Sequence, residues 1–119
     1  MSLQRGERVA ASASGSGSRW ELRFAVGEAA QGWDELCRQA PANALVAYEE
    51  MRRREVEQAP TTRHHRLKGT LATGIHNGTP MEQWQYEVTA DGRIWYLIDT
   101  GHRTLWVRYA GTGHPRTAE

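Results

Sequence analysis

The residues best able to do chemistry gather in the second half of the chain, between positions 63 and 116. All five histidines lie there, and Arg, Lys and His recur where the expected strands begin or end. Imidazoles exchange protons near neutral pH, and cationic side chains bind phosphate. The pattern therefore suggests a phosphate-bearing partner and acid–base work on it. The candidate residues of this kind are His65, Arg66, Lys68, Arg93, Arg108, His114 and Arg116.

Such a set of residues could cleave RNA without a metal ion. The ribose 2′-hydroxyl would attack the adjacent phosphorus, so the site must take a proton from it, give one to the departing 5′-oxygen and stabilise the phosphorane. Arg and Lys could stabilise the charge, and His, Lys, Tyr or Glu could move the protons. The chain lacks a Gly-rich phosphate loop, a nucleophile elbow and a paired-carboxylate pattern. Hydrolysis through a covalent Ser or Cys therefore has no support.

Aromatic residues add a second means of holding nucleic acid. Most tryptophans and tyrosines of the expected strands should lie in the core, but strand alternation should turn some outward, where a ring can stack on a base. We take Trp84, Tyr86 and Tyr109 as the aromatic candidates for RNA binding.

Several candidates also have ordinary structural explanations. Arg93 directly follows a predicted hairpin turn and could equally pair with Asp91 or Glu87. A lone lysine such as Lys68 is usually just solvated. The His64-His65 pair has no third ligand at a suitable spacing, so we expect neither a metal ion nor a cofactor.

Composition limits the possible classes of protein. A chain of 119 residues with a net charge of +1 predicts one domain, and its bulk charge does not indicate nucleic acid. The single cysteine, Cys37, excludes an internal disulfide and is expected to be a small buried hydrophobe. No apolar run suits a membrane span or a signal peptide, so we expect a cytoplasmic protein.

The expected elements follow from hydrophobic spacing. The Ser/Gly/Ala-rich residues 1–18 are predicted to be a disordered leader before a single domain over 19–119. A strand at 20–24 and helices at 26–40 and 42–58 should precede a β-meander that begins near Arg66. Residues 74–80 read as a turn-rich loop, and 90–92 as a hairpin turn. The fold class is thus α+β, with a small antiparallel sheet, mixed at its N-terminal strand, and a two-helix hairpin on one sheet face.

This order of segments, with two motifs, resembles the RelE/ParE superfamily of bacterial type II toxins. Arg66-Leu67-Lys68-Gly69 is similar to the basic-Leu-basic-Gly step that opens the family's sheet. The spacing from Trp84 to Gly92-Arg93-Ile94-Trp95-Tyr96 is similar to the family's aromatic strand and its Arg-containing hairpin. The match favours the RelE, YoeB and HigB branch because of the C-terminal histidine.

The resemblance implies a function, partners and residue roles. RelE-type members cleave mRNA in the ribosomal A site, and a cognate antitoxin protein wraps and inhibits them. Arg93 falls on the phosphate-stabilising arginine, Lys68 on or beside a basic residue of the sheet, and His114 on the C-terminal catalytic segment. Arg116 could replace a terminal cation, and His65 stands where YoeB-like members carry a glutamate base.

Two alternatives remain open at the level of sequence. One is a non-catalytic toxin that binds DNA gyrase, as ParE-like members do. The other is a degenerate toxin-like scaffold that only binds a partner.

Overall fold

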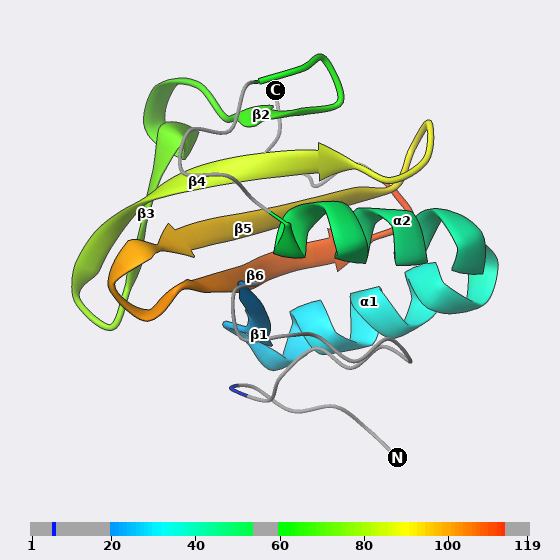
Figure 1. Cartoon of the computed structure of the whole chain (residues 1–119), viewed down its shortest axis with the longest axis horizontal. Coiled ribbons are helices and arrows are strands. Elements are labelled where there is room, and N and C mark those ends of the chain that lie inside the picture. Colours follow the sequence, from blue (N-terminus) through cyan, green and yellow to red (C-terminus); the bar gives the residue numbers. More distant parts are fainter. Residues whose placement is uncertain (1–5, 7–19, 54–59, 114–119) are drawn as a thin grey trace.

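The computed structural model describes residue 6 and residues 20–53 and 60–113, which form two helices and a mixed sheet (Figure 1). The elements in chain order are β1 (Glu21–Phe24), α1 (Gly27–Gln39), α2 (Pro41–Arg52), β2 (His64–Arg66), the 3-10 turn η1 (Gly69–Ala72), β3 (Thr73–His76), β4 (Thr79–Glu87), β5 (Arg93–Asp99), the 3-10 turn η2 (Thr100–His102) and β6 (Thr104–Gly111).

The six strands form one open sheet in the order β1-β6-β5-β4-β2, with β3 paired to β4. β1 runs parallel to β6, and the other neighbouring pairs are antiparallel. The predicted α+β class and the mixed pairing of the first strand are therefore confirmed. Both helices lie over the same side of the sheet (Figure 1).

The hydrophobic core fills the space between the helices and the sheet face that they cover, here called the core face. Helix α1 contributes Ala29, Ala30, Trp33 and Leu36, which are spaced so that one side of the helix is apolar. Cys37 is only half-buried at the edge of this cluster. From the sheet, the core includes Leu22, Phe24, Trp84, Tyr86, Ile94, Tyr96, Ile98, Leu105 and Val107.

The segment predicted to be a loop at 74–80 is instead a β-hairpin. β3 pairs with the start of β4, and Ile75 lies opposite Pro80. The two turn residues Asn77 and Gly78 have φ angles of 51° and 82°. Positive φ at both positions is what a tight two-residue hairpin needs, and Asn-Gly adopts it at little cost. The Asn-Gly pair was therefore a strand-to-strand signal that the loop prediction missed.

Element boundaries also differ from the predictions. α2 ends at Arg52, not at residue 58, and residues 54–59 lie outside the described part. The meander begins at His64, two residues before Arg66. Leu67 and Lys68 follow the end of β2 and connect it to η1.

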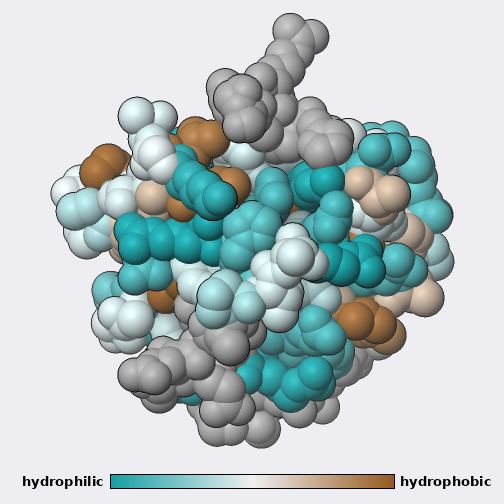
Figure 2. All heavy atoms as spheres, turned by 90° about the horizontal axis from the view of Figure 1, so that it is seen from above, coloured by the Kyte–Doolittle hydropathy of each residue, from teal (hydrophilic) through white to brown (hydrophobic). Residues whose placement is uncertain are grey.

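The edges of the sheet carry polar groups. Figure 2 looks onto the β2 side of the molecule, where hydrophilic side chains dominate and hydrophobic ones are scattered. A charged edge discourages pairing with strands of other molecules. At the opposite edge, the Gly6 amide donates to the Phe24 carbonyl at 2.8 Å, and Arg23 donates to the Gly6 carbonyl at 2.7 Å. The rest of the predicted leader lies outside the described residues.

Candidate functional site on the outer sheet face

Four residues form a row across the sheet face that points away from the helices, here called the outer face. The strand register places His65 of β2 opposite Gln85 of β4, Gln85 opposite Trp95 of β5, and Trp95 opposite Tyr109 of β6. Side chains directly opposite each other on neighbouring strands lie about 4.5–5.5 Å apart at Cβ. This cross-strand row therefore brings an imidazole, an amide, an indole and a phenol onto one surface.

His65 is held in a defined orientation at one end of the row. Its Nδ1 lies 3.1 Å from the Thr61 carbonyl oxygen. Because a carbonyl only accepts, Nδ1 must carry the proton and donate it. In the neutral imidazole, Nε2 then holds the lone pair and can accept a proton. His65 is only half-buried, so this geometry suits a general base.

One hydrogen bond and one ring contact join the other members of the row. The Trp95 indole donates to Gln85 Oε1 at 2.8 Å, and the Trp95 and Tyr109 ring centroids are 6.1 Å apart. The Tyr109 hydroxyl donates to the Gly113 carbonyl at 2.7 Å. Trp95 is itself buried, so the partly exposed members of the row are His65, Gln85 and Tyr109.

Tyr109 keeps its proton more firmly than an ordinary tyrosine. Burial raises the pKa of its phenol, and the nearby charge of Arg93 opposes that shift only in part. A protonated phenol on this face could donate a hydrogen bond to a ligand in place of the Gly113 carbonyl.

Arg93 does not present an open guanidinium. Its side chain is only 8% exposed, and it forms an ion pair with Glu87 at 2.9 Å. Its Nη1 donates to the carbonyls of Thr89, Ala90 and Gly92 at 3.0–3.2 Å. The guanidinium thus closes the β4–β5 hairpin from within. Arg93 is predicted to stabilise phosphate, and in this structure its Nη1 and Nη2 are engaged by the turn carbonyls and by Glu87.

The other predicted cations are distributed over the sheet and its loops. Lys68 is exposed and immediately precedes η1, and Arg108 is exposed on β6. Arg66 binds the segment that follows its strand, because its guanidinium donates to the Ala72 carbonyl at 2.9 Å and to the Thr73 hydroxyl at 3.1 Å. His114 and Arg116 lie outside the described residues.

Two of the aromatic residues predicted to bind RNA lie on the core face of the sheet. Trp84 and Tyr86 are buried in the core cluster beneath the helices, so their rings cannot stack on a base in this structure. The reason is strand alternation: β4 turns its even-numbered residues toward the helices and Gln85 toward the outer face. Trp95 and Gln85 were missed as row members, although the same alternation could have identified them.

His64 occupies the core face directly beside His65. It is 6% exposed, its Nε2 is hydrogen-bonded to the Tyr96 hydroxyl at 2.5 Å, and its ring contacts Trp84 and Tyr86. Adjacent strand residues point to opposite faces, so the two imidazoles cannot share a metal ion. Within the described residues, no group of three or more potential metal ligands is present.

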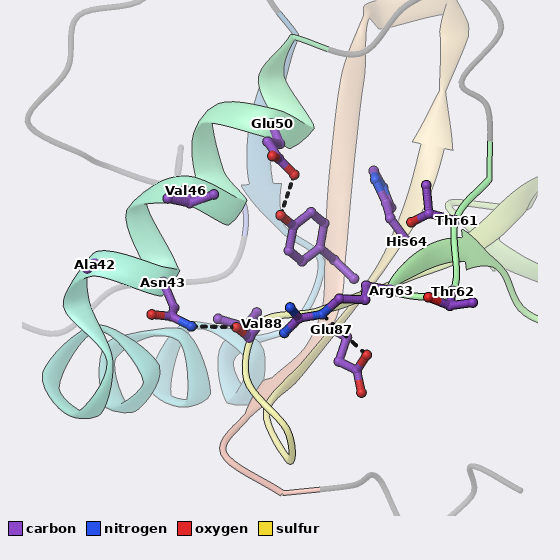
Figure 3. A pocket seen from close by; sticks show the side chains of 11 residues that line it. Ala42, Asn43, Val46, Glu50, Thr61, Thr62, Arg63, His64, Glu87 and Val88 are labelled. Carbon is purple, nitrogen blue, oxygen red and sulfur yellow. Dashed lines mark hydrogen bonds and ion pairs between the residues drawn. The ribbon is translucent and has the colours of Figure 1, made fainter.

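A groove of about 530 Å³ opens between α2 and the segment that leads into β2 (Figure 3). Ala42, Val46 and Val88 give it an apolar part. Glu50 accepts a hydrogen bond from the Tyr86 hydroxyl, and Arg63 lies 3.5 Å from Glu87. Sequence patterns gave no indication of this groove, because its walls come from segments far apart in the chain.

Neither described helix is long and apolar enough to cross a membrane. No protein-family model matches the chain, and no curated protein or solved structure matches it either. The family resemblance therefore rests on the residues and segment order given above.

Proposed function

We propose that this chain is the toxin of a type II toxin–antitoxin pair and cleaves mRNA in the ribosomal A site without a metal ion. The observation that carries the proposal is the orientation of His65. With its Nδ1 proton bound to the Thr61 carbonyl, the imidazole offers Nε2 on the outer face. Attack by a ribose 2′-hydroxyl requires a base of this kind.

The remaining roles fall to other residues of the sheet and to the C-terminal segment. Tyr109 lies three strand spacings from His65, or about 14 Å, so its hydroxyl could hydrogen-bond to a phosphate farther along the RNA rather than act on the same bond. Exposed Lys68 and Arg108 could bind phosphates of the RNA, and Arg93 would hold the β4–β5 hairpin in place. His114 and Arg116 keep the roles that the resemblance implies, as a second proton-transfer group and a cation.

The architecture also supports the proposal. An N-terminal strand and a helical pair precede the meander, and both helices cover one face of the sheet. On the opposite face His65, Gln85 and Tyr109 stay partly exposed, whereas Trp95 and Leu97 between them are buried. The proposed partners are the A-site mRNA and a cognate antitoxin that inhibits the toxin.

A second candidate function is a non-catalytic toxin that binds a protein target, such as DNA gyrase. The engagement of Arg93 within its own hairpin favours this candidate, because a phosphate-stabilising arginine should present its donors to substrate.

Induction of the chain in a bacterium, with mapping of transcript 5′ ends, tests both candidates. The endonuclease proposal predicts growth arrest with new 5′ ends inside translated regions. His65→Gln should lower cleavage about 100-fold, since Gln keeps polarity but cannot take up the proton. His102→Gln, which changes an exposed histidine on η2, is the matched control and should cleave normally.

The result that would overturn the endonuclease proposal is growth arrest without new 5′ ends. That outcome would favour the protein-binding toxin. Unchanged cleavage by His65→Gln at equal expression would remove His65 from the mechanism.

A further inference from the structure

The two helices present different surfaces to solvent. Every exposed position of α1 is polar or charged: Glu28, Gln31, Asp34, Glu35, Arg38 and Gln39. Helix α2 instead exposes Leu45 and Val46, at 44% and 52%. Its opposite side is buried in the core through Ala44, Ala47, Tyr48 and Met51. A helix that is apolar on both sides is typical of one that is covered on both sides.

The apolar side of α2 continues into the groove beside it. Ala42 and Val46 line the groove with Val88 of the facing strand end. Glu50 stands one turn beyond Val46, and Arg63 lies across the groove (Figure 3). The surface therefore has an apolar strip with a carboxylate on one wall and a guanidinium on the other.

Glu50 and Arg63 can each form a new ion pair while the groups that they contact now keep a hydrogen-bonding or charged partner. The Tyr86 hydroxyl binds one oxygen of Glu50 and so orients the carboxylate. Arg63 is 59% exposed and contacts Glu87 at only 3.5 Å, whereas Arg93 binds the other oxygen of Glu87 at 2.9 Å. Arg63 can thus turn to another carboxylate while Glu87 stays paired.

We propose that this α2 face binds a second copy of the same chain. A twofold interface brings one patch against itself, so the patch must be complementary to itself. An apolar strip flanked by one negative and one positive group meets this condition, because Glu50 of each copy can pair with Arg63 of the other. The desolvated centre would consist of Leu45 and Val46 from both copies.

The interface is small, so the dimer should be weak. Helix α2 has 12 residues and is therefore about 18 Å long. Stable dimers bury roughly 800 Å² per partner, usually through about 20–30 residues on each side, and this face is built on a single helix of 12 residues and its groove. We expect dissociation in the micromolar range.

Sedimentation equilibrium of the full chain, from low-micromolar to near-millimolar concentration, tests the proposal. The mass should rise from the monomer value of 13.4 kDa toward twice that value. Val46→Glu and Leu45→Glu should each raise the dissociation constant by about tenfold or more, since a carboxylate would enter the apolar strip. Circular dichroism should verify that each variant is folded.

Matched controls come from exposed apolar residues elsewhere. Val26→Glu and Ile75→Glu change residues that are 37% and 60% exposed but lie outside this face, so they should dimerise as wild type does. Glu50→Arg and Arg63→Glu should each weaken the dimer, and the double variant should recover part of the loss.

A wild-type chain that stays at 13.4 kDa throughout overturns the proposal, whatever other protein it binds. So does a dimer that Val46→Glu leaves intact, or one that Ile75→Glu disrupts equally.

Discussion

His64 and His65 are neighbours in sequence, yet the structure places them in opposite environments. His64 lies on the core face, hydrogen-bonded to Tyr96 and enclosed by aromatic rings. His65 lies on the outer face, held at one nitrogen by a backbone carbonyl. One imidazole is thus a packed structural group and the other a group that can meet a ligand. The difference teaches that residue type alone does not locate chemistry, because a one-residue step along a strand exchanges the two faces.

Arg63 and Arg93 show the same contrast around a single carboxylate. Both pair with Glu87, but Arg93 is buried within the hairpin and Arg63 is mostly exposed. The ion pair at the buried arginine supports the fold, whereas the exposed one is screened by water and contributes little.

Replacement of the buried Arg93 is expected to have the largest effect on stability. Arg93→Ala should lower the free energy of unfolding by about 3–5 kcal/mol, because it leaves Glu87 without its close partner and three turn carbonyls without their donor. Arg63→Ala should change stability by no more than about 0.5 kcal/mol. Urea unfolding of both variants measures the difference. Equal losses would mean that burial does not separate the two arginines.

The next largest difference in stability is expected between alanine variants of the two histidines. His64→Ala should cost roughly 2–4 kcal/mol, from the cavity among the aromatic rings and the lost hydrogen bond to the buried Tyr96. His65→Ala should stay within about 0.5 kcal/mol of wild type. Thermal unfolding at one pH compares them directly. A large loss in His65→Ala would place that imidazole in the structural framework and weaken its assignment as a base.

Much of the fold could be predicted from local patterns. The strand around Leu22, the apolar spacing of Trp33 and Leu36, and the alternation through Ile94 and Tyr96 all lie in the predicted element types. These signals are local, since each depends on a helix or strand period. The hairpin at Asn77-Gly78 was equally local, and it was missed only because its turn residues were read as a loop.

The candidate site was harder to predict because it depends on register. Which residues share the outer face follows from the pairing of Gln85 with both His65 and Trp95, and pairing joins residues far apart in the chain. Burial of Arg93 likewise depends on how the turn carbonyls fold back around it. Trp84 and Tyr86 were predicted to bind RNA because the sequence shows that they are aromatic but does not show which face of the sheet they occupy.

The smallest expected effect concerns Tyr86, at the boundary between the core face and the groove. Tyr86→Phe removes the hydrogen bond to Glu50 and should cost about 1 kcal/mol near neutral pH. Burial, and then the hydrogen bond and charge of Glu50, raise the pKa of Tyr86 above its ordinary value of 10.0. Above about pH 10 the unfolded phenol therefore loses its proton while the folded one keeps it, so the unfolded state binds fewer protons. The stability contributed by Tyr86 is complete below that pH and declines as the pH rises.

Paired urea titrations of wild type and Tyr86→Phe between pH 8 and pH 11 should show the advantage of wild type shrinking above about pH 10. A constant difference across that range would mean that the Tyr86 phenol titrates alike in both states, and that Glu50 and burial leave it as free as a phenol in water.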